Sequence, residues 1–294
     1  MGSLRVLGKS ASALRPLITV VRSVERNAAT QMPLAVVDGP PAATARLREI
    51  LGVGAAERPS ATAGPRVAVA AAGFDLAPAA AVLAAAKRDG RRALMIVIGT
   101  ADERQALERA TIAHTPLELS NVVHIVSFGD AELVRRTLAA VLGSDGAAIA
   151  RSHPLLRDAV ADAMIAQTAR QASTVGAAVI VPGADMPVIT LIQVRLVAQL
   201  AAVYGRPLDV RRGLEIGGVL LSAIGWRALA RRAVTSIPVA GFALRAGIAY
   251  SGTRAVGEAC KAYFATMGDR ADAPLDGLAK ALNGALAQRK GTSH

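Results

Sequence analysis

The stretch ALMIVI at residues 93–98 sets the interpretation of the N-terminal half of the chain. It is a short, continuous apolar run with β-branched residues, and Gly99 ends it, which is typical of a buried strand. Similar short runs occur on both sides of it, at residues 34–37, 66–70 and 122–127. We therefore predict four strands in this half of the chain.

Helical segments alternate with these strands. Apolar residues recur at helical spacing in residues 42–51, 77–87, 102–109 and 131–142. Alternation of strands and helices is typical of a parallel sheet with helices on its faces. The sequence therefore predicts an α/β N-terminal domain with a small, mostly parallel sheet, over residues 31–150.

The second half of the chain is predicted to be helical. Glycine and proline residues separate four candidate helices, which are residues 153–171, 188–204, 211–236 and 239–267. We predict an all-α domain over residues 151–268. We expect a basic helix at residues 1–30 before the α/β domain, and a short helix with a polar tail at residues 269–294 after the all-α domain.

The loops after the candidate strands resemble those of a P-loop GTPase in part. In such a protein the first strand leads into a glycine-rich loop with a lysine, and the loop amides bind phosphate. Here residues 38–44 read DGPPAAT, which lacks the lysine, and its two prolines have no amide hydrogen to donate. Of the Asn-Lys-x-Asp loop that selects guanine, only Asp102 is present. We predict a degenerate GTPase-like domain without nucleotide hydrolysis, although other α/β sheets also carry small and polar residues at strand ends.

Other catalytic and metal-binding patterns are absent from the sequence. His114, His124, His153 and His294 do not have the spacing of metal ligands. Cys260 is the single cysteine, and its Ala- and Gly-rich surroundings favour packing over a nucleophilic role. We therefore predict that the chain is not an enzyme and needs no cofactor and no metal.

The charge of the chain favours an anionic partner. The formal net charge is +12, mostly from arginine, while aromatic residues make up only 3% of the chain. Nucleic acid is disfavoured, because few aromatic side chains are present to stack on bases and no nucleic-acid-binding motif occurs. An anionic membrane surface is the favoured partner, although a solvated basic face would carry the same residues. The candidate interaction residues are Arg206, Arg211, Arg212, Arg227, Arg231 and Arg232.

Two of the candidate helical segments are almost wholly apolar. Arg195 interrupts residues 187–204, and Arg245 interrupts residues 233–250, so neither is an uninterrupted membrane span. Such helices suit a buried soluble bundle, and they equally suit helices that lie in a bilayer or dip into it. Glycines such as Gly247 and Gly257 are predicted to permit close helix approach.

Three polar residues near residues 187–204 are candidate structural groups. Asp185 precedes the helix and is expected to cap it. Gln193 either ties two helices together, in which case its hydrogen bonds must be satisfied, or faces solvent. Of Gln193 and Arg195, one is expected to face a polar interior and the other a partner or water.

Five blocks of the C-terminal half carry a family resemblance. They read GADMPVITLIQ (183–193), LAAVYGRPL (200–208), GWRALAR (225–231), IP (237–238) and AYSGTRAVG (249–257). In order and spacing they resemble domain of unknown function 697, the YcjF-like domain. Members commonly follow a predicted bacterial GTPase domain or act beside a GTPase partner, and they are often predicted to be membrane proteins. The resemblance covers residues 150–265 approximately, and it implies a membrane-associated helical domain without a known reaction.

The residues and this resemblance together predict a noncatalytic, membrane-associated accessory or scaffold protein with a pseudo-GTPase-like N-terminal half. We expect it on the cytoplasmic side of the membrane, peripheral or integral, and otherwise in the cytoplasm. A GTPase, another protein or a second copy of the chain is an expected partner. Two alternatives stay open: an atypical nucleotide-binding switch, and a soluble protein that binds another protein or a small ligand.

Overall fold

The chain divides into two compact units, one of residues 30–163 and one of residues 1–29 and 164–294. Each unit is considered by itself. The computed structural model describes residues 16, 18–27, 34–37, 41–53, 66–71, 81, 84–86, 88–90, 93–99, 123–127, 130–178, 186–206 and 241–266.

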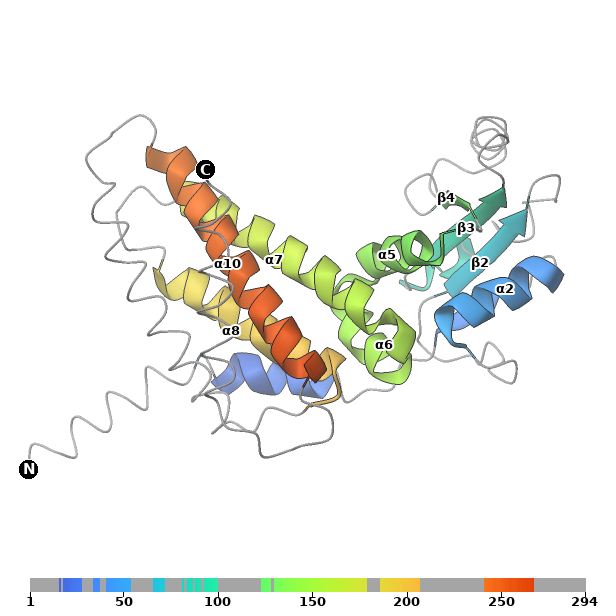
Figure 1. Cartoon of the computed structure of the whole chain (residues 1–294), viewed down its shortest axis with the longest axis horizontal. Coiled ribbons are helices and arrows are strands. Elements are labelled where there is room, and N and C mark those ends of the chain that lie inside the picture. The colour runs from blue at the N-terminus through green and yellow to red at the C-terminus, as the bar shows by residue number, and fades with distance from the viewer. Residues whose placement is uncertain are drawn as a thin grey trace, which may run out of the picture. The chain divides into compact units, whose positions relative to one another are not determined.

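The first unit contains a four-stranded parallel sheet (Figure 1). Its strands follow the order of the sequence and are β1 (Ala35–Val37), β2 (Arg66–Ala71), β3 (Ala93–Gly99) and β4 (Val123–Ser127). The β2–β3 pairing runs from Arg66 opposite Ala93 to Ala71 opposite Ile98. The apolar run at residues 93–98 therefore forms a strand with a neighbour on each side, which accounts for its lack of polar residues.

The prediction of a degenerate GTPase-like α/β domain over residues 31–150 needs correction. Where the structure describes side chains as well as backbone, 92% of the residues are helical and none lies in a strand. The core that can be described is therefore helical. The strand order also differs from that of doubly wound nucleotide-binding sheets, in which the order reverses next to the first strand and the ligand binds at that reversal. Among the described strands, β1 lies at an edge and the order runs in one direction.

Two helices of the first unit pack against each other. They are α2 (Pro41–Leu51), which follows β1, and α5 (Ala131–Leu142), which follows β4. Each buries leucines on one face, such as Leu47 and Leu51 of α2 and Leu138 of α5. The apolar residues recur every three or four positions, so they form one stripe along each helix.

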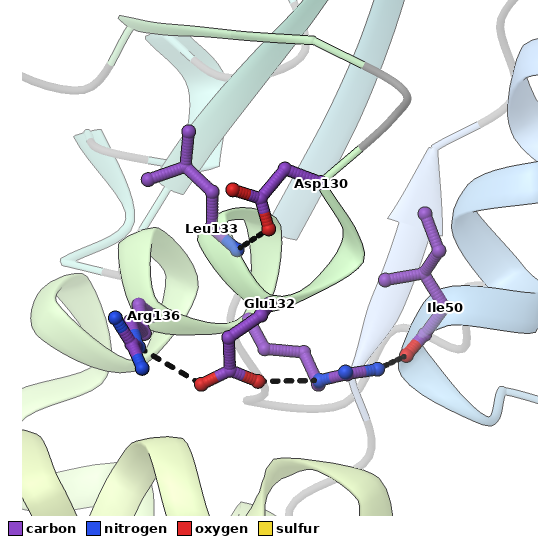
Figure 2. Close-up of polar contacts among 6 residues, drawn as sticks. Ile50, Asp130, Glu132, Leu133 and Arg136 are labelled. Atoms are coloured by element: carbon purple, nitrogen blue, oxygen red, sulfur yellow. Dashed lines mark hydrogen bonds and ion pairs between the residues drawn. The ribbon is translucent and has the colours of Figure 1, made fainter.

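Polar contacts fix the start of α5 and its place beside α2 (Figure 2). Asp130 precedes α5, and its Oδ1 accepts a hydrogen bond from the backbone N–H of Leu133 at 2.9 Å, which satisfies one of the free amides of the first turn. Glu132 lies between two arginines, with its carboxylate 2.8 Å from Arg136 Nε and 3.4 Å from Arg135 Nε. Arg135 Nη1 also donates to the carbonyl oxygen of Ile50 at 3.4 Å, so a cation from α5 satisfies a carbonyl in the last turn of α2.

A short buried helix follows α5. It is α6 (Gly146–Ser152), flanked by the 3₁₀ turns η2 (Gly143–Asp145) and η3 (Pro154–Leu156). Residues 146–150 are all buried. The next helix begins after Pro154, because proline tolerates only the first turn of a helix.

Three long helices form the core of the second unit (Figure 1). They are α7 (Arg157–Ala178), whose first turns belong to the first unit, α8 (Met186–Val203) and α10 (Gly241–Thr266). Residues 18–27 form a further helix, which buries Val21 and Val24.

Contacts at successive levels fix the directions of these three helices. From each level of contacts to the next, the residue numbers increase on α8 and α10 and decrease on α7. Therefore α8 and α10 run parallel, and α7 runs antiparallel to both. Both α8 and α10 therefore begin where α7 ends (Figure 1). The levels are Ala172 with Ile189 and Ala249, then Gln193 with Thr253, then Ile165 and Leu196 around Gly257.

Candidate functional site

The structure describes three of the residues that the sequence singles out. Gln193 is buried and Arg195 is exposed on α8, so they lie on different faces of one helix. Arg206 is half-buried just beyond the end of α8. The three do not converge on one site. The others lie outside the described residues, namely Asp185, Arg211, Arg212, Arg227, Arg231 and Arg232.

Arg206 takes part in ending α8. Gly205 adopts φ 71°, the left-handed conformation that glycine favours after a helix. The backbone N–H of Arg206 then donates to the carbonyl oxygen of Ala201 at 2.7 Å. Its backbone thus satisfies a carbonyl at the helix end, which is a structural role.

Gln193 joins α8 to α10 through a buried hydrogen bond. Its Nε2 donates to Thr253 Oγ1 at 3.1 Å, and the two residues are 3% and 0% exposed. Among the described residues, Gln193 Oε1 has no hydrogen-bond partner. Because buried polar groups are stabilised by their hydrogen bonds, this contact favours one alignment of the two parallel helices.

Replacing Thr253 with valine is expected to lower the free energy of unfolding by about 1–3 kcal/mol, because the Gln193 amide would lose its described partner while staying buried. Adding Gln193→Leu should recover most of that loss, since the double variant leaves no unpaired polar group at this contact. Urea unfolding followed by circular dichroism measures both. Losses that simply add in the double variant would show that the two side chains are not coupled.

Cys260 is a packed core residue. It is fully buried on α10, and this burial raises the pKa of its thiol from 9.0 to about 12. A thiol with such a pKa is almost wholly neutral at pH 7, and the neutral form is a poor nucleophile. The prediction of a packing role for Cys260 fits this environment.

The raised pKa of Cys260 predicts lower stability at high pH. In the unfolded chain the thiol loses its proton above about pH 9, whereas in the folded chain it keeps the proton up to about pH 12. Between these values the folded state holds more protons, so the free energy of unfolding should fall by up to about 1.4 kcal/mol for each pH unit from this group.

The control is Cys260→Ala, which should flatten this part of the stability profile. Native protein at pH 8 should also react with a thiol reagent at least about 1,000-fold more slowly than denatured protein, given the thiolate fractions. Equal labelling rates in the two states would contradict the burial of Cys260.

In the residues that the structure describes, one end of the bundle in the second unit is almost without charge. Here α7 ends while α8 and α10 begin, and we call residues 171–178, 186–194 and 241–253 the apolar end. Arg245, which is half-buried, is the one charged residue in these ranges. Three large apolar side chains are exposed there, namely Val188 at 44%, Phe242 at 57% and Leu244 at 41%.

Three exposed arginines lie at the base of the apolar end, one on each helix. They are Arg170 of α7, Arg195 of α8 and Arg254 of α10, and we call them the arginine belt. Residues 163–178, 186–206 and 241–257 contain no aspartate or glutamate. The described charges within these ranges are therefore all positive, and the carboxylate of Glu258 lies beside Arg254 at their border.

Arg254 is held in place by its own helix. A hydrogen bond with the Tyr250 side chain raises the pKa of Arg254, and the charge of Glu258, 3.5 Å away, raises it further, against the lowering effect of partial burial. Glu258 lies one turn farther from the apolar end than Arg254. The guanidinium thus stays charged and close to the helix surface.

The described helices do not include one with both the length and the apolar character needed to cross a bilayer. Within the described part of the chain, no group of three His, Cys, Asp or Glu side chains could hold a metal ion. Comparison with protein-family models, curated proteins and solved structures gives no match to the chain. The resemblance to the YcjF-like domain therefore stays an expectation.

Sequence reasoning did not find the apolar end. Its parts come from three segments that are separate along the chain, so the sequence does not show that they share one end of the bundle. The sequence does contain one indication of this end. Between residues 163 and 206, Asp185 is the single acidic residue.

Proposed function

We propose that the chain is a noncatalytic accessory or scaffold protein that binds peripherally to an anionic membrane surface through the apolar end of its helical bundle. The observation that carries this proposal is the exposure of Val188, Phe242 and Leu244 on a surface where Arg245 is the one described charge. The three side chains share one end of the bundle, and exposed apolar surface of this kind is typical of interaction sites. The positive charge around them favours an anionic partner over a neutral one.

Two contributions of similar size support membrane binding. Burying the exposed parts of the three apolar side chains contributes about 3 kcal/mol in total. Each basic residue near an anionic surface contributes about 1 kcal/mol, so Arg170 and Arg195 together add about 2 kcal/mol. Arg254 adds less, because Glu258 beside it offsets part of its charge. Neither contribution alone gives firm binding, because association also restricts the motion of the protein. Binding should therefore depend on both apolar insertion and anionic lipid.

Flotation with vesicles tests this proposal. The full chain should float with vesicles of phosphatidylcholine containing about one-third phosphatidylserine, and much less with phosphatidylcholine alone. Raising the salt from 0.1 M to 1 M should release most of it, since charge attraction is screened at the higher ionic strength.

Two results would contradict the proposal. If the chain stays unbound with the anionic vesicles, the apolar end does not bind membranes, and a soluble protein partner becomes the better interpretation. If binding withstands both salt and alkaline carbonate, the chain is an integral rather than a peripheral membrane protein. Fractionation of expressing cells with the same two washes repeats the test in a native membrane.

A further inference from the structure

The geometry points to a defined orientation on the membrane: we infer that the bundle inserts end-on, with the apolar end in the outer part of one leaflet and the arginine belt on the lipid phosphates. This inference rests on the proposed function and adds the depth, the orientation and the residues that recognise the lipid headgroups. The observation that supports this inference is the position of the arginine belt relative to the end of the bundle.

The three arginines of the belt lie at one level of the bundle. Arg195 and Arg254 each come one or two residues after the hydrogen-bonded pair Gln193 and Thr253. They therefore lie at nearly the same height on the two parallel helices. Arg170 lies between the level of Ala172, which packs with Ala249, and that of Ile165, which meets Gly257. The three arginines therefore lie at similar heights on three different helices.

The length of the bundle beyond the belt matches the outer part of a leaflet. At 1.5 Å per residue, Arg170 to Ala178 and Arg195 to Pro187 each span about 12 Å, and Arg254 to Phe242 spans about 18 Å. The headgroup layer is about 5–7 Å thick, and interfacial helices reach about 5–10 Å into the acyl boundary. These layers sum to about 10–17 Å, so arginines at the phosphates place Phe242 and Leu244 among the first acyl carbons.

Two features limit the depth. Arg245 lies three residues from Phe242, and the first backbone amides of α8 and α10 lie at the same end of the bundle. Such groups are costly in hydrocarbon but are tolerated at the headgroup level, where a long arginine side chain can reach phosphate or water. The apolar end therefore stops near the interface and does not reach the bilayer midplane.

Environment-sensitive labels test the depth directly. Single cysteines would replace Val188, Leu244 and, as a far-end control, the exposed Ala262 of α10, each labelled with the fluorophore NBD. The native Cys260 can stay, because it is buried. With anionic vesicles, labels at 188 and 244 should shift to the blue and be quenched more by lipid with a spin label at carbon 5 than at carbon 12. The label at 262 should not change.

Charge-neutralising variants test the belt. Arg170→Gln and Arg195→Gln should each weaken binding to anionic vesicles about five-fold. Arg88→Gln, at an exposed arginine of the other unit, makes the same change in net charge and should have little effect. Equal weakening by all three variants would show that net charge, and not the belt, holds the lipid.

The outcomes separate this inference from the proposed function. If the chain binds anionic vesicles but the labels at 188 and 244 stay in water, the orientation is wrong and membrane binding stands. If the chain does not bind vesicles, both are wrong. If the two labels shift to the blue in the absence of vesicles, the protein itself covers the apolar end and the orientation is overturned.

Discussion

Replacing both Phe242 and Leu244 with aspartate should weaken binding to anionic vesicles by about 100-fold or more. Both side chains are exposed at the apolar end, so the change should leave the bundle folded. The variant loses about 2 kcal/mol of apolar burial on the membrane. It also places two carboxylates against anionic headgroups, and every 1.4 kcal/mol lost is a ten-fold loss of affinity. Vesicle titration followed by sedimentation measures the dissociation constant.

The matched control is Leu133→Asp. Leu133 is 40% exposed on α5, in the other unit, so the substitution introduces one carboxylate, half of the charge change of the double variant, away from the apolar end. Its binding should match that of the unchanged chain. If Leu133→Asp weakens binding as much as the double variant does, acidic charge alone explains the loss. If the double variant binds normally, the apolar end is not the membrane site.

A large stability effect is expected at Gly257. A Cβ there would lie 2.7 Å from Cγ1 and 2.9 Å from Cγ2 of Ile165, and 3.2 Å from Cδ2 of Leu196. Ile165 is branched at Cβ and buried, so it cannot turn away easily. Gly257→Ala should therefore lower the free energy of unfolding by about 1–3 kcal/mol, although alanine favours the helix.

Gly247 on the same helix supplies the control. A Cβ at Gly247 would have nothing within 4 Å, so Gly247→Ala should stabilise the protein by about 0.5–1 kcal/mol through helix propensity alone. The two variants should thus shift the urea midpoint in opposite directions. A stabilising effect of Gly257→Ala would mean that α7, α8 and α10 do not meet as closely as described.

Several elements follow from the sequence. The run at residues 93–98 forms β3, and the segment predicted as a helix at residues 131–142 is α5. Strong apolar periodicity decides both, and no neighbouring segment opposes it. The strand order did not follow, because pairing between strands depends on how the whole sheet assembles.

The ends of helices could not be predicted from helix propensity alone, because they depend on tertiary contacts. The sequence predicts that a helix ends at Gln171, before residues that favour helices weakly, yet α7 continues to Ala178. In the structure the Thr174 hydroxyl donates to the carbonyl oxygen of Arg170 at 3.1 Å. A Cβ at Gly176 would lie 3.1 Å from the carbonyl oxygen of Arg245, which is a tight contact, so glycine favours the close approach of α10. Packing thus overrides propensity here.

The sequence and the structure indicate different arginines for the proposed interaction site. An excess of arginine indicates an anionic partner, but the arginines chosen from the sequence were those that cluster along the chain. The arginine belt comes from three separate helices, and Arg195 was the one member noted in advance. Residues that gather by folding leave no cluster in the sequence.

The parallel course of α8 and α10 has a consequence for the newly made chain. The contact between Gln193 and Thr253 joins residues 60 positions apart, whereas α7 and α8 are separated by residues 179–185 alone. On the ribosome, the antiparallel pair can form early, but α8 must wait for α10. At about 5–20 residues per second, that wait is about 3–12 s. During this wait Leu196, which lies beside Gly257 in the folded bundle, has no α10 to cover it, and such exposed apolar surface makes the nascent chain prone to aggregate.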